Sequence, residues 1–135
     1  MSNELWRVIL GLAILGHGLG HVLFMPAMAG VMKLQASGHS WLLTGVAGDA
    51  LTKGLASLVA GVVLVAFVVA SGGLFLQASW WRPVAVIGAV ASIVLIAAMW
   101  DGLLASPAIA ALVFDAAILV ALLIVKWPTE DMIGA

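Results

Sequence analysis

Four long apolar runs, separated by shorter polar breaks, dominate the pattern of hydrophobic and polar positions along the chain. They cover residues 5–25, 51–76, 81–104 and 107–127. Each run is long enough for an α-helix to cross a hydrocarbon core of about 30 Å. The runs lack the period-2 alternation of barrel strands and far exceed the ~10 residues that such strands need. The pattern predicts an all-α integral membrane protein, a four-helix bundle with up-down topology.

Proline, serine and glycine mark the expected helix ends. Pro26 and Pro128 end the first and fourth runs, and Pro83 suits the first turn of the third helix. Ser106-Pro107 has the pattern of an N-cap followed by the first helical residue. Ser71-Gly72-Gly73 is expected to loosen the last turns of the second helix.

The connections between the runs differ in length. The second and third are short, so the helices that they join are expected to be antiparallel neighbours. The first, residues 26–50, is too polar and glycine-rich to span, and we expect it to cap the non-cytoplasmic end of the bundle. Small residues four apart predict close helix packing in three of the helices. These pairs are Gly16 and Gly20, Ser57 and Gly61, and Gly88 and Ser92.

Composition supports the same class of protein. Of the 135 residues, 65% are hydrophobic and only 8% charged, with a mean hydropathy of +1.28, whereas soluble domains carry about 25% charged residues. The length leaves room for a single transmembrane domain over residues 1–135. A net charge of -1 without a basic cluster makes nucleic acid an improbable partner. The absence of cysteine excludes disulfides and thiol chemistry within the chain.

The few basic residues suggest an orientation. Arg7, Arg82 and Lys126 fall on one side of the membrane, and Lys33 and Lys53 fall on the other. The positive-inside rule therefore favours cytoplasmic N- and C-termini in a multi-pass protein of the cell membrane, as in a bacterial inner membrane. Two histidines and four glycines in the first run favour a true span over a cleaved signal peptide. Five tryptophans lie near the expected span ends, as in an aromatic belt. They are Trp6, Trp41, Trp80, Trp81 and Trp127.

Ionisable groups at bilayer depth are costly, and they are candidate functional residues for that reason. His17 and His21 lie four residues apart, so their rings share one face of the first helix. At 1.5 Å per residue, His17 lies roughly 16 Å from Trp6, and Asp115 reaches a similar level from the opposite face. Asp101 is expected about one turn above His21, close to that opposite face.

Matched depth predicts a hydrogen-bonded pair of His17 and Asp115, with His21 and Asp101 one level above them. The alternative is that these groups only bond neighbouring helices, or, for Asp101, mark a helix end at the water interface. Trp100 beside Asp101 is either a wall of the site or one more belt tryptophan. Asp49 and Lys53 open the second helix as a solvated start, and His39 is expected to be an ordinary loop residue.

The candidate chemistry stays broad at this point. His17 and His21 have the spacing of metal ligands, and two carboxylates could complete a zinc, iron or manganese site. A single axial histidine for a haem or other pigment is allowed by geometry, and a His–Asp proton relay is physically sensible. A polar pocket in a four-helix bundle could also bind the head group of a quinone or lipid. No residue pattern indicates nucleophilic or hydrolytic catalysis, and whether the protein is an enzyme stays open.

The segment from Leu15 to Phe24, LGHGLGHVLF, resembles the first helix of the DoxX-like four-helix membrane proteins. That family typically shows an HG-x-x-K/H-L pattern there, together with four spans and a long first connection. His17 and Gly18 fit the pattern, whereas His21 stands where lysine is more usual. The resemblance implies a small membrane subunit, associated in some members with quinone-linked oxidoreductases.

These observations predict a small membrane protein that binds an amphipathic ligand or cofactor, a quinone, lipid or pigment. The expected ligand-binding residues are His17, His21, Asp101, Asp115 and Trp100. The protein is expected to be an auxiliary subunit of a redox or transport complex, with a membrane-protein partner or as a homo-oligomer. The alternatives are a structural or assembly subunit that has no ligand, and a small ion or proton transporter.

Overall fold

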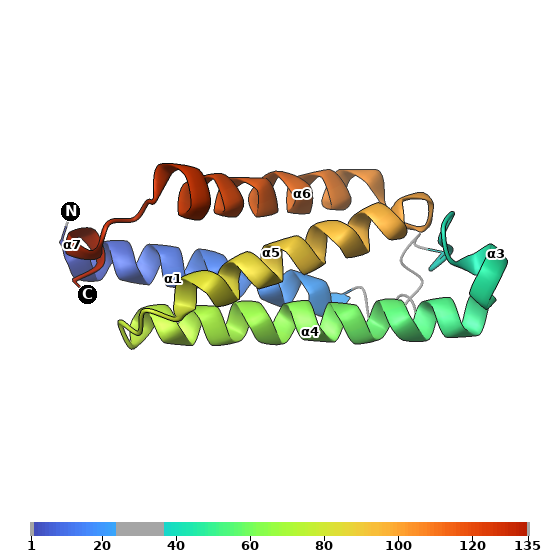
Figure 1. Cartoon of the computed structure of the whole chain (residues 1–135), viewed down its shortest axis with the longest axis horizontal. Coiled ribbons are helices and arrows are strands. Elements are labelled where there is room, and N and C mark those ends of the chain that lie inside the picture. Colours follow the sequence, from blue (N-terminus) through green and yellow to red (C-terminus); the bar gives the residue numbers. More distant parts are fainter. Residues whose placement is uncertain (1, 24–36, 135) are drawn as a thin grey trace.

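Four long helices make up the bundle in the computed structural model, which describes residues 2–23 and 37–134. They are α1 (Asn3–Gly20), α4 (Asp49–Phe75), α5 (Trp81–Ala98) and α6 (Ala105–Leu119). Successive long helices run in opposite directions, so both termini lie at one end of the molecule (Figure 1). With the short turns that extend α1 and α6, each is long and apolar enough to cross a membrane. The predicted all-α bundle of four candidate spans is confirmed.

Short elements finish the long helices and the two ends. A 3-10 turn, η1 (His21–Leu23), extends α1, and another, η2 (Trp100–Gly102), follows α5. A π-helix, η3 (Val120–Val125), extends α6. The one-turn helix α3 (Thr44–Ala47) lies at the end opposite the termini, and α7 (Glu130–Ile133) lies beside the N-terminus (Figure 1).

Several predicted boundaries were wrong by a few residues. The third span ends at Ala98 rather than at 104, because the chain turns through η2 there. The fourth helix begins at Ala105 with Leu104 as its N-cap, so Ser106 is not the cap. Ser71-Gly72-Gly73 does not loosen α4, which continues to Phe75 while the Ser71 hydroxyl donates to the Gly11 carbonyl, 2.8 Å away. The first span begins at Asn3, two residues before the predicted start. Residues 24–36, which include Pro26 and Lys33, lie outside the described part of the chain.

The predicted small-residue contacts are only partly correct. Gly88 and Ser92 of α5 are buried, and a Cβ at Gly88 would lie 3.3 Å from Ala66 of α4. Gly16 and Gly20 instead face open space. The close approach of α1 to α4 occurs at Gly18, where a Cβ would lie 2.6 Å from the Cβ of Phe67. A small residue marks a helix as able to pack closely, but its position around the helix decides whether it does.

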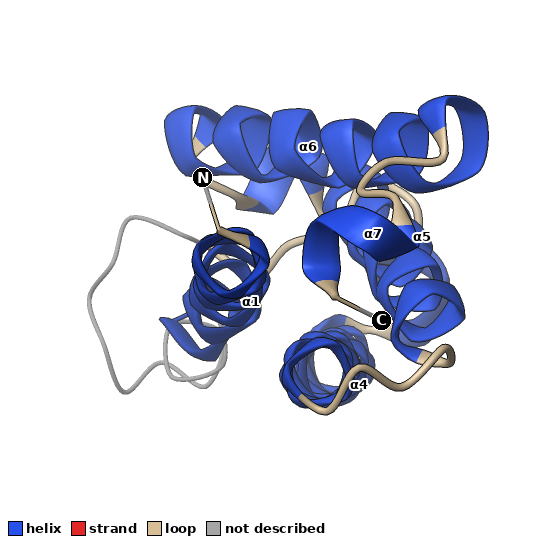
Figure 2. Ribbon diagram, turned by 90° about the vertical axis from the view of Figure 1, so that its left-hand side faces the viewer, coloured by secondary structure: helices blue, strands red, loops and turns tan. Residues whose placement is uncertain are grey.

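Helix α6 packs less closely than the others. In the 18-residue apolar stretch of each helix that could span a membrane, 11% of α6 is buried inside the protein, against 39% of α4 and of α5. When α1 and α4 are viewed nearly end-on, α6 lies across the top of the bundle rather than parallel to them (Figure 2). Its contacts are mainly with α5. This inclination separates α6 from α1 over part of their length.

The C-terminal segment covers the end of the bundle where the chain termini lie. Ile133 of α7 is almost fully buried in the main core cluster. The guanidinium of Arg7 donates to the Ile133 carbonyl at 3.3 Å, and Arg82 donates to the Pro128 carbonyl at 2.6 Å. Two of the three cations predicted on one face therefore anchor the segment that follows the last span.

Candidate ligand-binding site

The predicted pairing of His17 with Asp115 is present in the structure. Nε2 of His17, on α1, lies 2.7 Å from Oδ1 of Asp115, on α6. The Asp115 side chain is fully buried, and that of His17 is 9% exposed. Counting depth along each helix placed the two residues at one level, and the bundle also turns them toward each other.

Ser92 of α5 joins this pair to the second histidine. The Ser92 Oγ lies 2.5 Å from Oδ2 of Asp115 and 3.0 Å from Nε2 of His21. Nδ1 of His21 lies 3.2 Å from the backbone carbonyl oxygen of His17, one turn earlier in the chain. His17, Asp115, Ser92 and His21 therefore form one buried polar network that links α1, α5 and α6, and we call it the His–Asp network.

Aromatic rings enclose the first histidine of the network. The Phe114 ring stacks on the His17 ring, with centroids 4.3 Å apart and planes at 20°. Phe67 of α4 meets the same imidazole edge-on at 4.9 Å. The two imidazoles also lie edge-to-face, 5.3 Å apart. Apolar rings exclude water, so they strengthen the electrostatic interactions inside the network.

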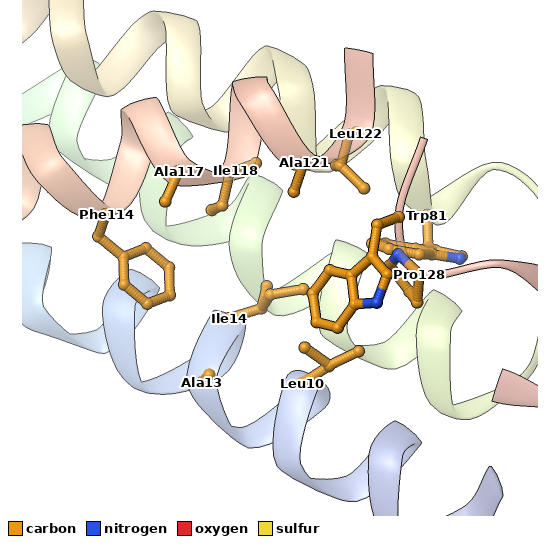
Figure 3. Close-up of a pocket in the computed structure, with 11 residues that line it drawn as sticks. Leu10, Ala13, Ile14, Trp81, Phe114, Ala117, Ile118, Ala121, Leu122 and Pro128 are labelled. Carbon is orange, nitrogen blue, oxygen red and sulfur yellow. The ribbon is translucent and has the colours of Figure 1, made fainter. Parts of the chain in front are cut away.

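An apolar cavity of about 240 Å³ is lined in part by Phe114. Leu10 and Ile14 of α1 face Phe114 and Ile118 of α6 across it, with Trp81 toward the end where the chain termini lie (Figure 3). The cavity occupies the space between α1 and the inclined α6 and is partly open to the molecular surface. The π-helix η3 contributes two further lining residues. Phe114 thus belongs both to the lining of the apolar cavity and to the surroundings of His17.

The predicted association of Asp101 with His21 was wrong. Asp101 lies in η2 and accepts hydrogen bonds from the His39 ring and from the backbone N–H of Trp41, the latter at 2.9 Å. His21 is bonded to Ser92. Axial depth placed Asp101 and His21 near each other, but η2 turns the carboxylate outward to the segment 37–43. His39, expected to be an ordinary loop residue, is the partner that this prediction missed.

The Asp101 carboxylate holds the segment 37–43 of the first connection against the end of α5. The Trp41 indole donates to the Ala97 carbonyl at 2.8 Å, and the Ser40 hydroxyl donates to the Ala98 carbonyl at 2.5 Å. Partial loss of water raises the pKa of Asp101, but the hydrogen bonds from His39 and Trp41 outweigh this and hold it below its ordinary value of 3.8. Within residues 37–48, the predicted capping of this end is observed.

The remaining residues singled out from the sequence lie outside the His–Asp network. Trp100 is 44% exposed in η2, and none of its described contacts brings it to the His–Asp network. Trp81, expected in an aromatic belt, is instead buried and lines the cavity. Lys53 pairs with Asp49 one turn away, at 2.6 Å, in the exposed start of α4. Of the five predicted ligand-binding residues, three, His17, His21 and Asp115, come together.

The geometry does not favour a metal ion or haem at the two histidines. Nε2 of His17 is bonded to Asp115, and both ring nitrogens of His21 are within hydrogen-bond distance of other groups. Among the described residues, no group of three or more histidine, cysteine, aspartate or glutamate side chains could hold a metal. A metal ion or haem would have to break one of these bonds to gain a ligand at His21 or at Nε2 of His17, which leaves only Nδ1 of His17 outside them.

Two important residues were missed from the sequence. Ser92 was assigned only to helix packing, although it lies eleven residues after Trp81 and hence roughly 16 Å deep, level with His17. The same depth count, applied to hydroxyl residues, would have found it. Phe114 is adjacent to Asp115 in sequence, but nothing in the apolar pattern distinguishes it from other core positions.

Comparisons with protein-family models, curated proteins and solved structures find no match to this chain. The site is therefore interpreted from its own geometry.

Proposed function

We propose that this membrane protein binds an amphipathic ligand of the quinone, lipid or pigment class. The apolar part of the ligand occupies the cavity between α1 and α6, and its polar part interacts with His17. The observation that carries the proposal is the position of Phe114, which lines the cavity and also stacks on His17. Rotation of a single side chain would join the apolar cavity to a buried hydrogen-bonding group.

The dimensions of the cavity limit what it can hold. Pockets that enclose drug-sized ligands usually measure about 300–1,000 Å³. A cavity of about 240 Å³ suits one ring or a short length of chain. The rest of the ligand would extend between α1 and α6 into the lipid, because the cavity is partly open and α6 is mostly unburied there.

The wider role that we propose is that of an auxiliary subunit in a redox or transport complex. The described residues outside the four spans form short turns and one-turn helices, which leaves little structure outside the membrane to support chemistry. The resemblance of residues 15–24 to DoxX-like proteins supports the same role. Membership of that family is part of the proposal.

Binding of decylubiquinone, a quinone with a ten-carbon chain, tests the ligand proposal in detergent-purified protein. Ala117 lines the cavity and its neighbour Ala116 does not, although both are exposed. Ala117→Phe should fill the cavity and weaken binding at least tenfold, measured by a thermal-shift titration. Ala116→Phe is the matched control and should bind like the unmodified protein. Mass spectrometry and an absorption spectrum of the purified protein would identify a ligand that is retained.

Two results would contradict the proposal. One is the absence of saturable binding of decylubiquinone together with no retained lipid or pigment. The other is equal loss of binding in Ala116→Phe and Ala117→Phe, which would place any ligand outside the cavity. Either result would favour the second candidate function.

That second candidate is a structural or assembly subunit, and the His–Asp network is the observation that favours it. Bonds that connect α1, α5 and α6 would serve as interhelical links even without a ligand, each worth about 0.6 kcal/mol on average in a membrane. His17→Ala separates the two candidates. It should lower ligand affinity with the fold intact under the first, and lower only stability or partner assembly under the second.

A further inference from the structure

The hydrogen-bond donors and acceptors of the His–Asp network are strongly constrained. A backbone carbonyl only accepts, so the bond at 3.2 Å between His21 Nδ1 and the His17 oxygen requires a proton on Nδ1. The other ring nitrogen, Nε2, faces the Ser92 hydroxyl at 3.0 Å. That nitrogen donates if it carries a proton and accepts if it does not.

The Ser92 hydroxyl has one proton but two close neighbours that can each accept it. Its Oγ lies 2.5 Å from Oδ2 of Asp115 and 3.0 Å from Nε2 of His21. If Ser92 donates to Asp115, the bond to His21 requires a proton on Nε2. If Ser92 donates to His21, the bond to Asp115 requires a proton on Oδ2. In both arrangements one additional proton completes the set of hydrogen bonds.

We propose that Asp115, Ser92 and His21 form a proton relay that holds one mobile proton. In one state Asp115 is a neutral carboxylic acid and His21 a neutral imidazole. The proton on Asp115 Oδ2 passes to Ser92 Oγ as the hydroxyl proton of Ser92 passes to His21 Nε2. Two O–H bonds break, while one O–H bond and one N–H bond form. The products are a carboxylate and an imidazolium, and Ser92 is unchanged.

The network keeps a net charge of zero in both states, which suits its position within the spans, where an uncompensated charge is costly. His17 takes the same role in each state, since Oδ1 of Asp115 can accept from its Nε2–H at 2.7 Å whether or not Oδ2 is protonated. This leaves Nδ1 of His17 as the nitrogen through which the relay can exchange a proton with a group beside Phe114.

The surroundings add no other ionisable group among the described residues in contact with the relay. Helix α4 presents Phe67, which lies against both histidine rings, and α6 presents Phe114. Aromatic rings of α4 and α6 thus lie against the two histidine rings. The inference concerns the protein without ligand and does not depend on the proposed function.

Spectroscopy of the protein in lipid nanodiscs can test the relay. The carboxylic-acid C=O band, assigned by its loss in Asp115→Asn, gives the protonated fraction of Asp115. The ¹⁵N shifts of labelled histidine give the doubly protonated fraction of His21. As temperature is varied near neutral pH, the two fractions should sum to one in the unmodified protein. In Ser92→Ala this relation should disappear, while Ser71→Ala, a buried serine outside the network, should retain it.

A second variant keeps the test informative if Ser92→Ala fails to fold. An amide at position 115 cannot receive the mobile proton as a carboxylate does, so Asp115→Asn should leave His21 neutral and protonated on Nδ1. A sum that departs from one in the unmodified protein would overturn the relay. So would a doubly protonated His21 in Asp115→Asn, or an unchanged relation between the fractions in a folded Ser92→Ala protein. If decylubiquinone does not bind while the Asp115 and His21 fractions still sum to one, the proposed function is contradicted and the relay is not.

Discussion

Two glycines in α1, only two residues apart, have opposite surroundings. Gly18 is buried against Phe67, and Gly16 faces open space. The contact at Gly18 brings the backbones of α1 and α4 together beside His17, whose ring packs against Phe67. A side chain at residue 18 would move α1 away from α4 and disturb His17 at the same time.

Gly18→Ala is therefore expected to destabilise the protein. Its Cβ would lie 2.6 Å from the Cβ of Phe67, an atom that cannot move without its helix. Overpacking of this kind costs about 1–3 kcal/mol. Gly16→Ala is the control and should be neutral or stabilising by about 0.5–1 kcal/mol, because alanine favours helix over glycine. Unfolding followed by circular dichroism in a denaturing-detergent titration measures both, and equal stabilities would contradict the close contact.

For single residues, the sequence predicted the depth of a residue along its helix well, but it predicted poorly the direction in which the side chain points. His17 and Asp115 could be paired because a helix rises by a fixed amount per residue. Asp101 was given the wrong partner, because depth says nothing about which way a side chain points once the helix has ended. Ser92 was overlooked as a polar group, since a serine among small residues also fits simple helix packing.

At the scale of elements, the segment 37–43 is held to the end of α5 mainly through side chains. Asp101 accepts two hydrogen bonds from this segment, one from the His39 ring and one from the Trp41 backbone N–H. The side chains of Trp41 and Ser40 each donate to a backbone carbonyl in the last turn of α5. Those carbonyls have no partner within a helix, so the segment serves as a C-terminal cap for α5. No local sequence signal predicted this, because the contact joins residues about 60 positions apart.

Docking of this segment should weaken in acid. The pKa of Asp101 is lower in the folded protein than its ordinary value of 3.8, so its ionised form stabilises the docked state. That contribution is complete above the ordinary value and is lost as pH falls through the lowered one. The indole N–H signal of Trp41 in NMR spectra should report it, with solvent exchange rising below about pH 4.

Asp101→Asn should show fast exchange of this indole proton already at neutral pH, because an uncharged amide accepts more weakly than a carboxylate. Asp49→Asn, at the same end of the molecule but paired with Lys53, is the control. If exchange at Trp41 were independent of pH in the unmodified protein, Asp101 would not hold the segment.

For the whole molecule, the up-down arrangement followed directly from the apolar pattern, since each run is long enough to span and two connections are short. The inclination of α6 did not follow from that pattern. Apart from Ser106 and Asp115 that helix is apolar, so its sequence indicates one side that packs but not the angle at which the helix crosses α1. The cavity that results from this inclination was accordingly not placed in advance.

Cysteine labelling can test the arrangement across the membrane, because the chain has no cysteine of its own. Ser79 lies in the exposed turn between α4 and α5, and Gly45 lies exposed in α3 at the other end. With cytoplasmic termini, as we propose, a membrane-impermeant maleimide added to intact cells should label Gly45→Cys and not Ser79→Cys. The reverse result would invert the orientation, and labelling of both would contradict the four-span arrangement.

The unequal lengths of the helices have a consequence for the host membrane. Helix α4 has 27 residues and α5 has 18, or about 40 and 27 Å of axial rise. The shorter helix sets the thinnest bilayer that fits the bundle, while the longer one can remain in contact with lipid as the bilayer thickens. A thicker bilayer would therefore immerse the first turns of α4 and the adjoining α3, and with them the Asp49–Lys53 pair.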